Sequence, residues 1–416
     1  MFAAFSTALS ALDANGVAVD VVGNNLANLN TTGYKESAAY FRDLVSESLD
    51  AGQTQLGFGV APPLTIREFT QGAIQASSGP LDAAIQGGGF FVVKNGDATV
   101  FTRAGNFQVD LSGNLLTPTG EKVQGWMAAG GVVNTGGPTG DITVPVGTLQ
   151  TPKATQNITL SANFNASAAT GVSSGWSTPM TVYDSLGNTH VLTVNFQKTA
   201  SNTWSYTATV PGADVSAGKA GTPYAIPKGS GSLTFDSNGQ LTSPAAGAPI
   251  TFNIAGLSDG ASDMSLSWNP YNADGTGALT QFEQSSAASA NSQDGLAAAQ
   301  LTGVTMGNGG QLLASYSDGQ QTVVGQVALA SIRNPQTLLA VGNNLFQVSA
   351  ETGAPAVGAP GTGGRGAVVG GALESSNVDI AQELTDLIRL QSAYQANAKV
   401  VTTVNTLAQA TTNLIA

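Results

Sequence analysis

The sequence predicts an α+β fold that is mainly β, with N- and C-terminal helices paired in a coiled-coil-like layer and two nested β domains between them. Three observations lead to this prediction. Before residue 27, apolar or glycine positions recur at alternating spacings of three and four, as in a heptad seam. After residue 379, apolar residues gather on one side of a helix with 3.6 residues per turn. Between these ends, short apolar runs alternate with turn residues, which is typical of strands.

The N-terminal helix pattern stops at a cluster of helix-ending residues. Asn28, Asn30 and Gly33 interrupt the apolar repeat, and Asn and Gly are common where helices end. Beyond this break, the apolar residues of segment 40–45 predict a short helix. The glycines and prolines of segment 57–63 then favour extended or loop geometry.

Strand and turn units follow in the centre of the chain. The apolar run Gly89–Val93, an Asn-Gly turn and the returning run 99–103 predict a β-hairpin. A second turn is expected at Asp110–Asn114. A second β region is expected from about Met180, with a turn at Asp184–Asn188.

A segment rich in Gly, Ala and Pro, residues 351–372, precedes the C-terminal helix and is expected to be a flexible linker. A hinge is expected at four of its glycines: Gly361, Gly363, Gly364 and Gly366. The run Ser376-Asn377-Val378-Asp379 then has the Ser-x-x-Asp form of a helix start, and the pattern stays helical to the end.

The order of these elements predicts nested domains, because helical segments stand at both ends of a largely β chain. We expect a terminal helical assembly domain of residues 1–33 with 374–416, connecting segments 34–72 with 364–373, an inner β domain of 73–148 with 286–363, and an inserted outer β domain of 149–285.

Composition excludes several classes of function. The chain has 416 residues and a hydrophobic share of 42%, which is ample for real cores. Only 10% of the residues are charged, against roughly 25% in an average globular protein, and such surfaces suit contact with copies of themselves. The net charge is -12 and the 14 Lys and Arg residues are scattered, so we expect no nucleic-acid partner and no membrane partner.

The sequence offers little to catalysis. His190 is the only histidine and the chain has no cysteine, so we expect a structural or exposed strand histidine, no zinc site and no cofactor. Residues 361–366 fit the dinucleotide pattern G-x-G-x-x-G, but they follow Ala-Pro rather than a strand. Aspartates such as Asp110 and Asp184 stand next to turn residues and are expected to cap local N–H groups. The chain is therefore expected not to be an enzyme.

Targeting signals are not evident in the sequence. A secretory signal needs a positive charge before its apolar run, and the first positive charge here is Lys35. No stretch approaches the roughly 18 apolar residues of a membrane span. The low-charge β composition looks extracellular, so we expect export without a cleaved signal peptide.

The terminal helices are the expected functional site, because their apolar stripes need partners. The residues expected at contacts between subunits are Phe2, Phe5, Leu9, Leu12, Val19, Asn25, Leu26, Asn28, Ile380, Leu384, Leu387, Leu390, Tyr394, Val401, Val404, Leu407 and Leu414. The alternative is that both stripes pack against the β domains of the same chain.

Both ends also resemble a known family. Bacterial flagellar rod and hook proteins have an N-terminal signature that resembles residues 8–35, ALSALDANGVAVDVVGNNLANLNTTGYK. Their C-terminal signature resembles residues 374–401, ESSNVDIAQELTDLIRLQSAYQANAKVV. Segments 80–93 and 101–126 are similar to the first β domain of the family, and the inserted region around 182–196 looks like that of its hook members.

This resemblance implies a structural subunit that polymerises with itself into the flagellar hook, a flexible tube that transmits torque from the motor rod to the filament. It implies four other partners: the distal rod, the hook cap, the hook-filament junction proteins and the flagellar export apparatus. It also implies an extracellular location in the flagellum. Alternatives are a distal rod subunit of the same family and, in a different class, a secreted β-rich adhesin or binding module. Loss of polymerisation on removing both termini favours the hook, and retained ligand binding favours the adhesin.

Overall fold

The computed structural model describes residues 2–44, 47–48, 55–171 and 175–415, and the chain forms two compact units. Unit 1 comprises Met1–Val146, Thr302–Ser315 and Gly319–Ala416, and unit 2 comprises Gly147–Leu301 and Tyr316–Asp318. The fold is mainly β with a helix near each end, which confirms the predicted fold class.

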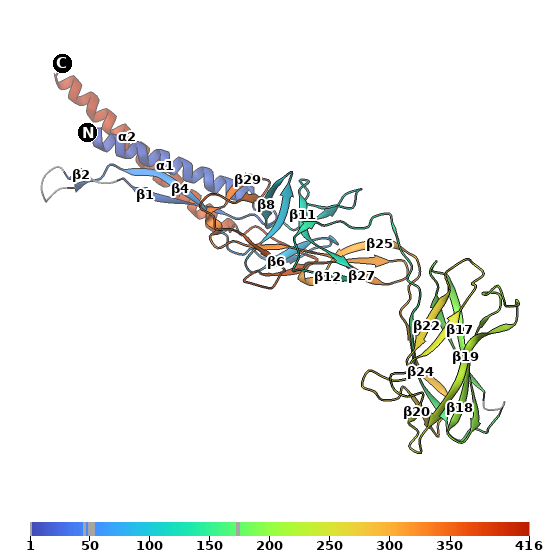
Figure 1. Cartoon of the computed structure of the whole chain (residues 1–416). Coiled ribbons are helices and arrows are strands. Elements are labelled where there is room, and N and C mark those ends of the chain that lie inside the picture. The colour runs from blue at the N-terminus through green and yellow to red at the C-terminus, as the bar shows by residue number, and fades with distance from the viewer. Residues whose placement is uncertain (1, 45–46, 49–54, 172–174, 416) are drawn as a thin grey trace. The chain divides into compact units, whose positions relative to one another are not determined.

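Helices α1 (Phe2–Ala27) and α2 (Ile380–Ile415) lie side by side in unit 1 (Figure 1). α1 ends directly before the predicted break. α2 begins three residues later than the Ser-x-x-Asp pattern predicts if Ser376 is the cap, because Asp379 is the residue that caps it. Its Oδ1 accepts hydrogen bonds from the N–H groups of Ala381 at 2.8 Å and Gln382 at 3.2 Å.

The predicted short helix at 40–45 is wrong for residues 40–44, and Val45 lies outside the described residues. Strand β1 (Ser37–Asp43) pairs antiparallel with β4 (Val60–Arg67), and the short strands β2 (Glu47–Ser48) and β3 (Gln55–Leu56) pair with each other. An isolated helix of this length is marginal in water. The strand gains a hydrogen-bonded partner instead, and the hairpin packs on α1, where the Val60 N–H donates to the Ser10 Oγ at 3.2 Å.

Unit 1 also contains a mainly antiparallel sheet in which neighbours follow the order β26-β27-β11-β7-β8-β30-β29. The predicted hairpin is confirmed as the pair β7 and β8. The other β-strands and the 3-10 helices of the unit are β5 (Ile74–Ala76), β6 (Ala83–Gln86), β7 (Phe90–Asn95), β8 (Ala98–Thr102), β9 (Gln108–Val109), β10 (Leu115–Leu116), β11 (Lys122–Ala129), β12 (Val132–Val133), β13 (Gly140–Asp141), η2 (Asn308–Gly310), β26 (Gln311–Tyr316), β27 (Gln321–Val327), β28 (Leu329–Ser331), η3 (Pro335–Thr337), β29 (Leu339–Gly342), β30 (Leu345–Gln347), β31 (Ala356–Gly358), β32 (Ala367–Gly370) and β33 (Ala372–Glu374).

The core of this sheet is aromatic and closely packed. Phe69, Phe90 and Phe346 meet edge to face, with ring centroids 5.3–6.0 Å apart. Gly105 lies where the chain passes another backbone, because a Cβ at this position would stand 1.7 Å from the Ala83 carbonyl oxygen.

Unit 2 is built from two five-stranded sheets whose facing sides share one core. One sheet has the order β16-β17-β18-β19-β20, and the other has the order β21-β22-β15-β23 with β24 paired to β15. The strands of these two sheets are β15 (Asn157–Asn165), β16 (Trp176–Tyr183), β17 (Thr189–Ala200), β18 (Thr203–Pro211), β19 (Pro223–Phe235), β20 (Leu241–Ser243), β21 (Ile250–Ile254), β22 (Met264–Trp268), β23 (Leu279–Phe282) and β24 (Ala287–Gln293). Strand β14 (Leu149–Gln150) pairs instead with β25 (Ala299–Met306), which begins in this unit.

Alternation with a period of two fills this core. Along β17 and β18, every second residue is buried and the residues between face outward. Phe164 of one sheet and Trp204 of the other have ring centroids 5.0 Å apart. The predicted boundary at residue 285 differs from this arrangement, since β24 pairs with β15 and the unit continues to Leu301.

Candidate assembly surface on the terminal helices

The two helices contact each other through small residues. Ala18 and Val22 of α1 form a buried cluster with Leu390 of α2. Small side chains at such positions let two helices pack closely. Val19, Leu26 and Leu387 pack around this cluster with part of their surface.

The predicted seam of α1 lies only partly in this contact, because Val19 and Leu26 pack against the cluster while Phe5 and Leu9 are exposed. Ala8, Ala18 and Asn25 are buried, and each directly precedes a predicted seam residue. One residue turns a helix by about 100°. The stripe that packs inside the chain is therefore centred between these buried residues and Val19 and Leu26 of the predicted seam, less than about 100° from the seam itself.

The side chains of the predicted seam residues of α1 differ in their exposure to solvent. Phe5 and Leu9 are 40% and 46% exposed, whereas Leu12, Val19 and Leu26 are half-buried. Phe2 was also predicted, but its side chain is not among those that the structure describes.

The predicted residues of α2 fall into three groups. Ile380, Leu384, Tyr394 and Leu407 are exposed, Leu387, Val401 and Val404 are half-buried, and Leu390 is buried. The predicted side chain of Leu414 lies outside those described. Ile388 is 65% exposed and was missed, although its position next to Leu384 on the same helix face could have indicated it.

Two of the predicted contact residues are used inside the chain. Leu390 and Asn25 are only 6% and 2% exposed, so neither offers its side chain to another copy. This corrects the prediction for both residues. Asn28, also predicted, is half-buried and donates to the Asn24 backbone oxygen at 3.0 Å in the last turn of α1.

Asn25 connects three segments. Its Nδ2 donates to Glu383 Oε1 at 2.7 Å and to the Ser37 carbonyl at 2.8 Å, and its Oδ1 accepts from the Ser37 N–H at 3.0 Å and from the Tyr34 hydroxyl at 3.2 Å. Burial raises the pKa of Glu383, and the hydrogen bond from Asn25 only partly opposes this. The start of β1 and both helices are thus held at one point.

A buried ionic cluster, missed by the sequence analysis, joins the segment after α1 to the segment before α2. Lys35 Nζ lies 2.6 Å from Glu374 Oε1, and Arg103 Nη1 lies 3.3 Å from Glu374 Oε2. Lys35 also donates to the Thr70 carbonyl at 2.6 Å. Burial lowers the pKa of Lys35 in spite of its ion pair. The Gly33 N–H donates to the Glu374 carbonyl at 2.7 Å, so this cluster fixes where both helices leave the β region.

The β1–β4 hairpin adds exposed apolar side chains beside α1. Tyr40, Phe41 and Leu64 are 47%, 45% and 46% exposed. The error in secondary structure hid this surface from the sequence analysis, because Tyr40 and Leu64 lie directly opposite each other only when β1 pairs with β4.

The predicted hinge glycines lie in a closed loop within unit 1. The Gly361 N–H donates to the Gly366 carbonyl at 2.8 Å, and the Gly366 N–H donates to the Gly88 carbonyl at 2.6 Å. Arg365 Nε donates to the Ala359 carbonyl at 3.0 Å. Strands β31 and β32 flank the loop in the same unit, so the expectation of an open, flexible linker is wrong for this segment. Gly363 and Gly364, the other two predicted hinge residues, have positive φ within it.

His190, expected to be a structural or an exposed strand histidine, is buried in unit 2. Its Nδ1 lies 2.9 Å from Asp214 Oδ2, and its Nε2 lies 3.1 Å from Asp184 Oδ2. Asp184 also caps its own turn as predicted, since its Oδ1 accepts from the N–H groups of Leu186 and Asn188. No spacing in the sequence indicated Asp214, because it lies in the turn after a different strand.

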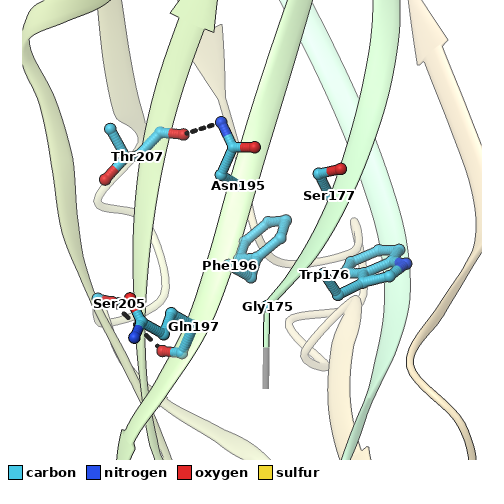
Figure 2. A pocket seen from close by; sticks show the side chains of 8 residues that line it. All are labelled: Gly175, Trp176, Ser177, Asn195, Phe196, Gln197, Ser205 and Thr207. Carbon is cyan, nitrogen blue, oxygen red and sulfur yellow. Dashed lines mark hydrogen bonds between the residues drawn. The ribbon is translucent and has the colours of Figure 1, made fainter. Parts of the chain in front are cut away.

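A hollow of about 260 Å³ lies on unit 2 near Trp176 and Phe196, whose rings stack at 5.4 Å (Figure 2). Asn195 donates to the Thr207 carbonyl at 3.3 Å beside it. The eight described residues that line the hollow include no charged side chain and no histidine. It therefore presents no group suited to acid-base catalysis at neutral pH.

Four family models match successive parts of the chain. They are described as flagella basal body rod protein (residues 5–35), flagellar hook protein FlgE/F/G D1 domain (84–164), flagellar basal body protein FlaE D2 domain (148–296) and flagellar basal body rod FlgEFG protein C-terminal (369–414). The matches at the two ends cover the terminal helices, and those in the middle cover β regions.

Curated relatives match over the whole length. The flagellar hook protein FlgE of Borreliella burgdorferi is 32% identical over 454 residues, with 98% of each chain covered. The chain belongs to the flagellar hook protein family. FlgE of Escherichia coli, another member, is 31% identical, with 99% of this chain and 100% of that one covered.

Membership of the flagellar hook protein family makes the chain a structural subunit of the flagellar hook, and so a component of motility. The crystal structure of Helicobacter pylori flagellar hook protein FlgE2 covers 71% of this chain and 99% of its own, with a TM-score of 0.53 and 15% identity, and so supports the fold alone. Among the described residues, no helix is both long enough and apolar enough to span a membrane.

Proposed function

We propose that this hook subunit polymerises through the exposed stripes of α1 and α2, which pack against neighbouring copies in the wall of a flexible tube that transmits torque from motor rod to filament. One observation carries the proposal. Phe5, Leu9, Leu384 and Tyr394 are each at least 40% exposed on helices that already pack together within the chain.

The exposed stripes supply a driving force for assembly. Each Å² of apolar surface removed from water stabilises the buried state by roughly 25 cal/mol. Few charges oppose it, because Lys399 is the last charged residue of α2. The proposed assembly surface is the predicted set without the buried residues Asn25 and Leu390 and with Ile388 added. Val19, Leu26 and Leu387 contribute to it only with the surface that the helix pair leaves open.

Polymerisation of a Leu9→Gln variant tests the proposal. The change removes an exposed apolar side chain from the seam, so we expect a monomer with unchanged helix content at concentrations where the unmodified chain forms filaments. Leu111→Gln is the matched control, because Leu111 is fully exposed on a turn of unit 1 and lies outside the seam. Sedimentation and electron microscopy measure assembly. Filament formation by Leu9→Gln at the same concentration as the control contradicts the proposal.

The specific neighbours are proposed from family membership. They are the distal rod, the hook cap, the hook-filament junction proteins and the flagellar export apparatus, with export to the cell exterior without a cleaved signal peptide. Mass spectrometry of the subunit recovered from isolated hooks tests the last point, and we expect an uncleaved N-terminal segment. A mature form that lacks roughly the first 15–30 residues contradicts it.

The chain is also proposed not to be an enzyme and to need no cofactor for assembly. Membership of a family of structural proteins supports this proposal. A distal rod subunit is the second candidate, because two of the matching family models carry rod names. A straight rather than curved filament of the purified chain favours the rod.

The four-part division of the chain is proposed with one change. The terminal helical segments 1–33 and 374–416 and the connecting segments are kept. The outer domain is extended to residue 301 because β24 pairs within it, and the inner β domain becomes 73–148 with 302–363. Limited proteolysis checks this boundary, and we expect a protected fragment that ends near residue 301 rather than 285.

A further inference from the structure

One histidine and three carboxylates meet in unit 2, where turns after β16, β18 and β21 reach the first residues of β17. His190 Nε2 lies 3.1 Å from Asp184 Oδ2 and 3.6 Å from Asp259 Oδ2, while Nδ1 lies 2.9 Å from Asp214 Oδ2. His190 is 5% exposed and Asp184 is fully buried, whereas Asp259 lies at the surface. The cluster is thus built into the unit and open on one side.

The two carboxylates that face Nε2 are fixed by their own turns. Asp184 Oδ1 accepts the N–H groups of Leu186 at 2.8 Å and Asn188 at 2.9 Å, and Asp259 Oδ1 accepts the Ala261 N–H at 3.0 Å. Asn188 Nδ2 also donates to Asp259 Oδ2 at 3.0 Å. Each carboxylate therefore uses Oδ1 for its turn and presents Oδ2 towards the imidazole.

We propose that His190 Nε2, Asp184 Oδ2 and Asp259 Oδ2 bind one divalent transition-metal ion of the zinc class. One ligand atom from each of these three residues lies within 4.8 Å of the other two. A metal with bonds of about 2.1 Å to nitrogen and oxygen needs ligand atoms roughly 3.0–3.6 Å apart for bond angles near 90–120°. The two separations from Nε2, 3.1 and 3.6 Å, meet this requirement without rearrangement.

Asp214 does not bind the ion itself but pairs with the other ring nitrogen, Nδ1, of His190. A hydrogen bond from Nδ1–H to a carboxylate selects the tautomer whose Nε2 carries the lone pair, as in carboxylate-histidine-zinc triads. Within the residues that the structure describes, His190 is the one basic side chain that pairs with these three carboxylates. A proton on the imidazole leaves the cluster with a charge of -2, and a divalent ion on neutral imidazole reduces this to -1.

The competing occupant of the same position is a proton, which makes His190 an imidazolium that donates to Asp184 and Asp214. A proton and a metal ion on Nε2 give this nitrogen different ¹⁵N chemical shifts. Because His190 is the only histidine, long-range ¹H–¹⁵N correlation spectra of its ring report on this nitrogen without overlap.

Zinc titration of the dilute, tag-free full chain after treatment with a chelator tests the proposal. We expect one Zn²⁺ per chain by calorimetry, a rise in the unfolding midpoint of unit 2, and a shifted Nε2 resonance with Nδ1 still protonated. Cobalt added as Co²⁺ reports the ligand geometry by its visible absorption.

Paired variants locate the site. Asp259→Asn keeps an acceptor for the Ala261 N–H and removes a charged ligand at the surface, so we expect zinc affinity to fall by more than about 10-fold. Asp263→Asn is the matched control, because Asp263 is also exposed and accepts the Gly256 N–H at 2.9 Å in the same loop. Equal affinity in both variants, or an imidazole that stays doubly protonated at saturating zinc, overturns the proposal.

Discussion

Asn25 Nδ2 donates to Glu383 Oε1 over 2.7 Å, which joins two helices at residues 358 positions apart in the sequence. Both side chains are buried, so water cannot replace this hydrogen bond if one partner is changed. The pair therefore bears directly on whether the terminal helices stay together in a free subunit.

Asn25→Asp is expected to loosen the helix pair, because it places a second carboxylate against Glu383 and removes the donor. We expect a loss of about 1–3 kcal/mol, seen as faster hydrogen exchange in α1 and the first turns of α2. Adding Glu383→Gln restores an amide-carboxylate pair and is expected to recover part of the protection. Asn405→Asp, at an exposed position of α2, is the control. Exchange in Asn25→Asp that matches this control contradicts the role of the pair.

Glu383→Gln alone is expected to change how the helix pair depends on pH. Burial raises the pKa of Glu383 above its ordinary value of 4.5, so its favourable contribution is fully present below pH 4.5 and is lost as pH rises through the folded-state pKa. The variant should therefore be the more stable protein at pH 7, with the difference shrinking towards pH 4. Hydrogen exchange in α2, measured for both proteins from pH 4 to pH 7, gives the difference in stability. A difference that grows as pH falls has the wrong sign for this account.

Glu374→Gln is expected to destabilise unit 1 strongly. The change leaves Lys35 and Arg103 as buried cations without their carboxylate, a loss of about 3–5 kcal/mol. Urea unfolding of the full chain measures it, with the exposed Glu351→Gln as control. Replacing Lys35 by Met and Glu374 by Leu together should cost less than Glu374→Gln, since no charge is then stranded between those two positions. Equal midpoints for Glu374→Gln and the control argue against an energetic role of the cluster.

Gly105→Ala is expected to destabilise unit 1 by sterics alone. A Cβ would overlap the Ala83 carbonyl oxygen, so the backbone must shift, at a cost of about 1–3 kcal/mol or more. Gly303→Ala is the control, because nothing lies within 4 Å of its Cβ position, and we expect a change within about 0.5 kcal/mol. Calorimetric unfolding of both variants measures the difference. Similar melting temperatures would show that the strand spacing at Gly105 relaxes freely.

Local chemistry explains which elements could be predicted. The β7–β8 hairpin follows from an Asn-Gly turn between apolar runs, and the turn of Asp184 follows from a carboxylate that caps N–H groups within four residues. The failure at 40–45 has the opposite cause. Strand β1 exists because β4 and α1 lie against it, and neither partner is evident from the six residues themselves.

By itself, the sequence determined that both ends are helices with apolar stripes, that β-strands lie between them, and to which family the chain is similar. An apolar period spans only a few residues, so it can be recognised in the sequence without knowing which distant segments pack against it. Only the tertiary structure decided that the stripe of Ala18 and Val22, one residue from the predicted seam, packs inside the chain, because the choice depends on how closely α2 fits against each face. It also brought His190 to Asp259 and Lys35 to Glu374, since burial free energy acts on residues that the chain path brings together, whatever their separation in sequence.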